Sequence, residues 1–74
     1  MMEEFSVELY DNKDLLITRY IIFEENISMA LEAAKNEAYH LININVCIPY
    51  TVSVSNENNH LVYKTLTKKT EKYY

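Results

Sequence analysis

Residues 15–42, LLITRYIIFEENISMALEAAKNEAYHLI, change from one hydrophobic period to another and so decide the fold. The part over residues 15–23 is rich in β-branched and aromatic side chains, which predicts a strand. From Ile27 onward the apolar residues recur every three or four positions, which predicts a helix over residues 27–42. Asn26 stands between the two and is a good N-cap residue, because its side chain can accept from the free N–H groups of a first turn.

The predicted helix is expected to pack closely on a sheet. Its apolar stripe has alanines at the centre and consists of Ile27, Ala30, Leu31, Ala34, Ala38 and Leu41. Small side chains allow the helix backbone to approach its neighbour. Asn43, which can replace glycine at a helix C-terminus, is expected near the end of the helix.

Alternation of apolar and polar residues on both sides of this stretch predicts three more strands, over residues 5–10, 46–55 and 60–67. The polar turns DNKD and NENN close two hairpins, one before the helix and one after it. We therefore expect a single α+β domain over residues 1–74 with the layout β-β-α-β-β. One helix packs on a mainly antiparallel four-stranded sheet, and residues 68–74 form a basic tail.

If Tyr10 pairs with Leu15 across the first turn, the register of the first hairpin assigns each residue to one of the two faces of the sheet. The face expected under the helix contains Phe5, Val7, Leu9, Leu16, Thr18, Tyr20 and Ile22. The opposite face of the sheet collects Tyr10, Leu15, Ile17, Arg19, Ile21, Phe23, Cys47, Pro49, Val62 and Leu66. One helix covers one side of a sheet only, so this apolar second face is predicted to bind a partner. The alternative is that strong sheet twist or a folded-back tail hides part of it.

Few residues of the chain are suited to chemistry. Glycine is absent, which excludes the glycine-rich phosphate-binding loops. The only cysteine and histidines, Cys47, His40 and His60, match neither a zinc pattern nor a nucleophile–base arrangement. The paired glutamates of residues 3–4 and 24–25 are explained by solubility and by the helix dipole. We predict no catalytic, metal or cofactor site and no enzymatic activity.

Charge is distributed unevenly along the chain. Residues 1–63 contain ten acidic and three basic residues, whereas residues 64–74 contain four lysines and one glutamate. The acidic body disfavours nucleic-acid binding, so only Lys64, Lys68, Lys69 and Lys72 are candidates for phosphate contacts. Glu8, Asp11 and Asp14 are expected to steer the protein towards a basic partner.

The sequence also predicts a compartment. A single cysteine cannot form an internal disulfide, which fits a reducing environment. No apolar run is long enough to span a membrane, and the acidic start MMEEFSVELY lacks the basic segment of a secretory signal. We expect a cytoplasmic protein with no membrane contact.

The stretch ITRYIIFEENISMALEAAKNEAYHLI and the hairpin VSVSNENNHLVYK produce a layout that resembles small phage and mobile-element inhibitors of the anti-CRISPR type. The acidic charge and the Asn, Lys, Ile and Tyr usage of AT-rich genomes agree with this resemblance. It implies binding to a host defence complex in the host cytoplasm, where the protein blocks nucleic-acid access without catalysis. Two alternatives remain open: a nucleic-acid-binding accessory domain that uses the tail, and a homodimer joined through the second face.

Overall fold

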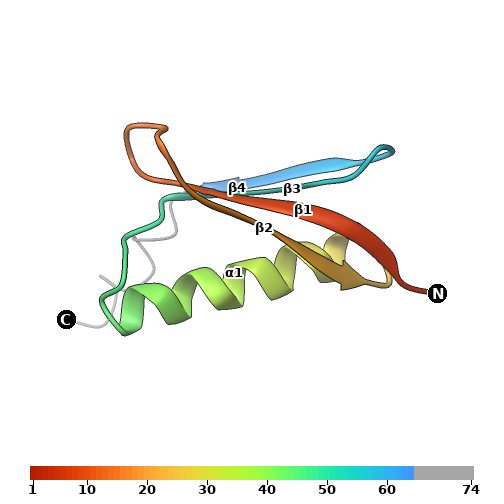
Figure 1. Cartoon of the computed structure of the whole chain (residues 1–74), viewed down its shortest axis with the longest axis horizontal. Helices are drawn as coiled ribbons and strands as arrows, with labels where there is room; N and C mark the ends of the chain where they lie inside the picture. Colours follow the sequence, from red (N-terminus) through yellow and green to blue (C-terminus); the bar gives the residue numbers. More distant parts are fainter. Residues whose placement is uncertain (65–74) are drawn as a thin grey trace.

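The computed structural model describes residues 1–64, in which one helix lies against one face of a four-stranded sheet (Figure 1). The elements in chain order are β1 (Glu3–Tyr10), β2 (Leu16–Glu24), α1 (Ile27–Asn43), β3 (Thr51–Ser55) and β4 (His60–Lys64). All neighbouring strands are antiparallel, in the order β2-β1-β3-β4. The predicted α+β class and the layout β-β-α-β-β are therefore confirmed, and β2 and β4 form the two edges of the sheet.

Asparagine forms both ends of the helix. The side-chain Oδ1 of Asn26 accepts from the backbone N–H of Met29 at 2.9 Å, which makes Asn26 the N-cap. At the other end α1 stops at Asn43, and Asn45 adopts a φ of 61°, a left-handed conformation that asparagine tolerates. Asparagine thus takes the place that glycine often occupies in other chains.

The core lies between α1 and the two central strands. Its fully buried apolar side chains are Phe5, Val7, Leu9, Ala30, Ala34, Ala38, Val52 and Val54. The helix residues among them are all alanines, so the helix lies close to the sheet, as the sequence predicts. On β2 the side chains that face the helix, Thr18, Tyr20 and Ile22, are only half-buried. The helix therefore covers β1 and β3 completely and the β2 edge incompletely.

The β4 edge contacts the helix through Tyr63. The ammonium of Lys35 lies 4.0 Å from the ring centroid of Tyr63, a cation–π contact between α1 and β4. Burial, together with the hydrogen bond and the charge of Tyr63, raises the pKa of the Tyr39 hydroxyl to about 12. These side chains link α1 to β4.

The register of the first hairpin differs from the predicted one by two residues. Leu9 pairs with Thr18 and not with Leu16, because the ladder is irregular between Leu9 and Tyr10 and β2 carries one extra residue there. A shift of two residues leaves the faces of a strand unchanged, so Thr18 and Tyr20 still face the helix. Leu16 is the exception. It lies opposite Tyr10 and is 48% exposed, so its predicted place under the helix is wrong.

The third strand is shorter than predicted. It begins at Thr51, and residues 46–50 form the connection between the helix end and the sheet. Pro49 lacks the N–H that a ladder position requires, and its side chain is fully buried, so its predicted place on the second face is wrong. Cys47 also lies in this connection, half-buried, and not on a strand. The predicted fourth strand is described from His60 to Lys64, and the basic tail lies outside the described residues.

Candidate functional site

Helix α1 lies on one face of the sheet, and within residues 1–64 no element packs on the other face (Figure 1). We call this second face the uncovered face. Strand residues that pair with one another point to the same side of a sheet. The observed register therefore places on the uncovered face Glu4, Ser6, Glu8, Tyr10, Leu16, Arg19, Ile21, Phe23, Thr51, Ser53, Ser55, His60, Val62 and Lys64.

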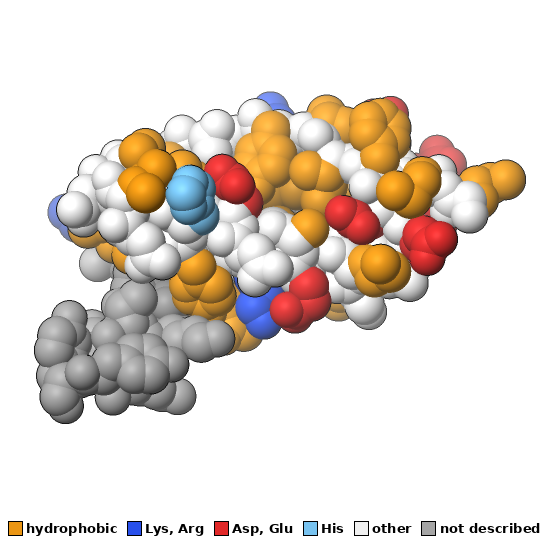
Figure 2. Space-filling view, turned by 90° about the horizontal axis from the view of Figure 1, so that it is seen from below, with side chains coloured by type: hydrophobic (Ala, Val, Ile, Leu, Met, Phe, Trp, Pro, Cys, Tyr) orange, Lys and Arg blue, Asp and Glu red, His pale blue; other side chains and the backbone are white. Residues whose placement is uncertain are grey.

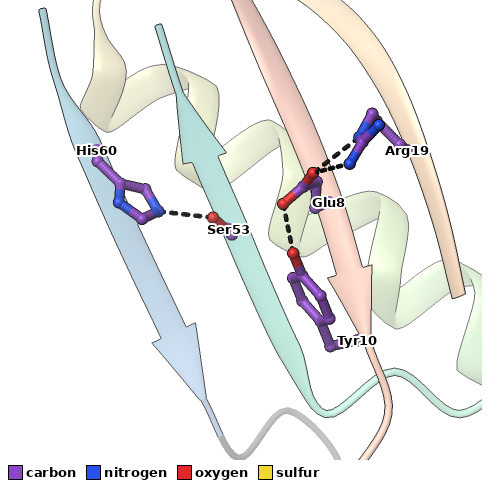
Figure 3. A network of polar contacts seen from close by, with 5 residues as sticks. All are labelled: Glu8, Tyr10, Arg19, Ser53 and His60. Atoms are coloured by element: carbon purple, nitrogen blue, oxygen red, sulfur yellow. Dashed lines mark hydrogen bonds and ion pairs between the residues drawn. The ribbon is translucent and has the colours of Figure 1, made fainter. Parts of the chain in front are cut away.

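A polar network crosses the middle of the uncovered face (Figure 3). At its centre Oε2 of Glu8 accepts from Nε of Arg19 at 2.7 Å. The same oxygen forms an ion pair with Nη2 of Arg19 at 2.6 Å. The second oxygen of Glu8 accepts from the hydroxyl of Tyr10. Nearby, Oγ of Ser53 and Nε2 of His60 are 2.7 Å apart. We call these five side chains the polar network.

The strand register brings the network together. Glu8 pairs with Arg19 on β2 and with Ser53 on β3, so the three residues form one row across the sheet. The hydrogen bond from Tyr10, followed by that from Arg19, lowers the pKa of the Glu8 carboxyl. The same contact with Glu8 raises the pKa of the Tyr10 hydroxyl. Glu8 is thus an ionised acceptor held in a fixed orientation at neutral pH.

Exposed apolar side chains flank the polar network. Ile21 is 50% exposed and Phe23 58% on β2, and Val62 is 47% exposed on β4. Leu15, also exposed, lies in the turn before β2. The uncovered face therefore combines a polar centre with apolar margins, whereas the sequence predicts a mainly apolar surface that Arg19 interrupts.

The other residues predicted for partner binding or steering are placed differently. Ile17 is half-buried and packs against the core, and Leu66 lies outside the described residues. The carboxylate of Asp11 accepts from the backbone N–H groups of Lys13 and Leu15, at 2.8 and 3.0 Å, and so holds the turn.

Two charged residues predicted to steer a partner or to contact phosphate lie near the ends of strands. Asp14, exposed, has a φ of 64° at the end of the same turn as Asp11. Lys64 is exposed at the end of β4, whereas Lys68, Lys69 and Lys72 lie outside the described residues. The structure therefore places one of the four predicted phosphate-contacting lysines.

Carboxylates gather where β1 begins. A shallow hollow of about 660 Å³ has Ile21 in its lining together with the carboxylates of Glu3, Glu4 and Glu57. Asn56, in the turn between β3 and β4, donates to Glu3 at 3.0 Å and joins that turn to β1. This end of the uncovered face is acidic.

The structure brings together one pair of groups that resembles catalytic machinery. Ser53 and His60 are within hydrogen-bond distance, as a nucleophile and its base are. An acyl-transfer site also needs a group that orients the second nitrogen of the imidazole, and no such contact is seen among residues 1–64. Cys47 precedes β3, whereas His60 lies at the far end of the same hairpin, and His40 is exposed on α1. In the same part of the chain no cluster of three or more His, Cys, Asp or Glu side chains is placed to hold a metal ion.

The network was not predictable because it depends on the neighbours of β1. The alternation of each strand places Glu8, Ser53 and His60 on the face away from the helix. The strand order β2-β1-β3-β4 then makes β1 central and brings Glu8 beside Ser53. The one sequence signal for the network was the opposite charge of Glu8 and Arg19, which lie on the two strands of the first hairpin.

Comparisons with known proteins add no relative. No family model matches the chain, and neither the curated proteins nor the solved structures contain a match to it. In the part of the chain that the structure describes, the single helix is too short and too polar to cross a membrane.

Proposed function

We propose that the chain is a protein-binding module that acts without catalysis and binds its partner through the uncovered face. The observation that carries this proposal is the exposure of Ile21, Phe23 and Val62 around a side-chain network that is already ordered. Large apolar groups at the margin of an ordered polar centre are a common feature of interfaces, in which tyrosine and arginine are enriched. Prior ordering of Arg19 and Tyr10 also reduces the entropy lost on binding.

The charge of the chain indicates the kind of partner. Residues 1–64 contain ten acidic and four basic residues, and three carboxylates line the hollow at one end of the uncovered face. Arg19, the one arginine of the chain, is already paired with Glu8. A partner with a basic surface is therefore attracted by these carboxylates, and the positive charge of Arg19 is already balanced by Glu8.

In its most specific form, the proposal is that the chain is an inhibitor of the anti-CRISPR type. Surfaces that bind nucleic acid are basic, because they neutralise phosphates. An acidic protein that binds such a surface of a host defence complex competes directly with the nucleic acid. This mechanism requires no reacting group on the chain.

Phage plating tests this specific form. In cells with active CRISPR–Cas immunity, expression of the chain is expected to raise the plating efficiency of a targeted phage. Phe23→Asp places a charge on the apolar margin of the uncovered face and is expected to reduce the gain at least tenfold.

Met29→Asp is the matched control, since Met29 is 45% exposed on α1, away from the uncovered face. Both variants change exposed side chains, so circular dichroism is expected to show an unchanged fold. The inhibitor proposal fails if wild-type chain does not raise plating in any CRISPR–Cas type tested. Equal losses for Phe23→Asp and Met29→Asp contradict the assignment to the uncovered face.

A further inference from the structure

Strand β2 presents a free backbone edge, and the hydrogen-bond alternation shows which residues form it. In the turn between β3 and β4 the N–H of Asn56 donates to the carbonyl oxygen of Asn59 at 2.9 Å. Bonded and non-bonded pairs alternate along an antiparallel ladder. Because Asn56 and Asn59 form a bonded pair, every second residue of β3 before Asn56 bonds to β4, and the residues between them, Ser53 among them, direct their N–H and C=O towards β1. Glu8, the partner of Ser53, therefore directs its backbone groups towards β3.

The alternation continues into the first hairpin. Val7, the next residue of β1, directs its N–H and C=O towards Tyr20 of β2. The residues of β2 on either side of Tyr20 therefore turn their backbone groups away from the sheet, and Phe23 does the same. Arg19, Ile21 and Phe23 thus form a row of N–H and C=O groups at the β2 edge, and no strand among residues 1–64 pairs with it.

A groove runs along the same edge on the helix side. It has a volume of about 480 Å³ between β2 and α1, and its lining is Thr18, Tyr20, Ile22, Ala33, Glu37 and Leu41. Figure 2, seen from the helix side, shows hydrophobic side chains recessed near acidic ones. The hydroxyl oxygen of Tyr20 is buried there and has no hydrogen-bond partner among the described residues. Burial and the nearby charge of Glu37 both raise the pKa of this hydroxyl.

The groove and the free edge fit one kind of ligand. A strand added to β2 places alternate side chains on the helix side, next to Tyr20 and Ile22. An apolar side chain at that position fills the space that α1 leaves open. We propose that an extended, basic segment of a protein partner adds to β2 as a fifth strand, with an apolar side chain in the groove and its lysine or arginine side chains near Glu24 and Glu37.

Charge favours such a segment over a second copy of the chain. Glu24 ends β2, Glu37 lines the groove, and the positive charge of Arg19 is already paired with Glu8. Two copies joined edge to edge add further carboxylates along the edge, whereas a segment with lysine or arginine two residues before and after its apolar residue places positive charge on the same helix-side face as these carboxylates. This inference rests on the protein-binding role proposed above, but it concerns the edge of the sheet and not the uncovered face.

The experiment is a nuclear magnetic resonance titration of the whole chain with the peptide KTVTK, in which the valine and the two lysines share one face of an extended strand. We expect the amide signals of Arg19, Ile21 and Phe23 to shift and their hydrogen exchange to slow. The matched peptide ETVTE is expected to produce neither effect, because it repeats the charge of the edge. Absence of shifts at β2 with the lysine peptide, or equal binding of the glutamate peptide, overturns the proposal.

Two variants separate the edge from the rest of the surface. Ile21→Pro removes one outward N–H at a position that an edge strand tolerates, and it is expected to weaken peptide binding at least tenfold. Val62→Pro is the matched control. By the same hydrogen-bond alternation the N–H of Val62 also points away from the sheet, but at the opposite edge, β4. Ala33→Leu fills the groove without changing a strand and is expected to weaken binding as well.

Sedimentation of the wild type and of Ile21→Pro tests whether a second copy of the chain, and not a partner segment, occupies the β2 edge. We expect both to be monomers. A wild-type dimer that Ile21→Pro dissociates assigns the edge to a second copy and overturns the proposal. Phe23→Asp changes a side chain of the uncovered face and leaves the backbone of β2 intact, whereas Ile21→Pro removes a backbone N–H of the edge. The two variants therefore test the edge proposal and the proposed role of the uncovered face separately.

Discussion

Phe5→Ala is expected to destabilise the protein by about 3–5 kcal/mol, the usual cost of removing a fully buried phenylalanine. Phe5 has no exposed surface and lies in the core between β1 and α1. A domain of this size has a total stability of only about 4–11 kcal/mol, so the substitution is expected to remove a large fraction of it. Urea denaturation followed by circular dichroism measures the change.

The second phenylalanine provides a matched control. Phe23, 58% exposed on the uncovered face, loses little when replaced, and Phe23→Ala is expected to change stability by no more than about 0.5 kcal/mol. Equal effects of the two substitutions contradict the assignment of the core to the helix side of the sheet. A small effect of Phe5→Ala alone contradicts it as well.

Ala34→Leu is expected to destabilise the protein by about 1–3 kcal/mol, because it inserts methylene groups where α1 lies closest to the sheet. Ala34 is 1% exposed and belongs to the alanine stripe of the helix. The neighbouring Ala33 lines the groove beside β2, where a larger side chain has room. Thermal unfolding of Ala34→Leu and Ala33→Leu compares the two positions.

For this pair we expect a lower melting temperature for Ala34→Leu and an unchanged or slightly higher one for Ala33→Leu. The opposite order indicates that the helix is rotated, with the Ala33 side against the sheet. In that case the groove along β2 does not exist. The pair therefore tests the helix orientation and the existence of the groove together.

The sequence predicts the elements of this fold well because their signals are local. The period change after residue 23, the N-cap at Asn26 and the alanine stripe each depend on residues within one helical turn or one strand. The faces of β2 were also predictable, because alternation depends only on parity. Leu16 fails because an extra residue near Tyr10 changes the parity at that point, and the alternation of β2 does not reveal it.

What the sequence does not predict depends on contacts between distant segments. The polar network requires β1 to lie between β2 and β3, and no local pattern specifies that order. The burial of Pro49 depends on the path of the connection from α1 to β3, which alternation after residue 46 conceals. The groove beside β2 depends on where α1 lies across the sheet, a consequence of packing between distant segments.

The position of β1 explains the character of the uncovered face. A central strand has neighbours on both sides, so the charged Glu8 finds Arg19 on one side and Ser53 on the other. The edge strands have neighbours on one side only, and their outward side chains Ile21, Phe23 and Val62 remain exposed. Polar groups are therefore satisfied at the centre, and apolar groups remain available at the margins.

The central claim is that the uncovered face binds a protein partner, and photo-crosslinking in host cells tests it most directly. A photoreactive phenylalanine analogue is placed at position 23, on the uncovered face, or at position 29, on the outside of α1. We expect a discrete crosslinked protein of the expressing cell from position 23 and none from position 29. The same crosslinked products from both positions, or products from position 29 alone, contradict the claim.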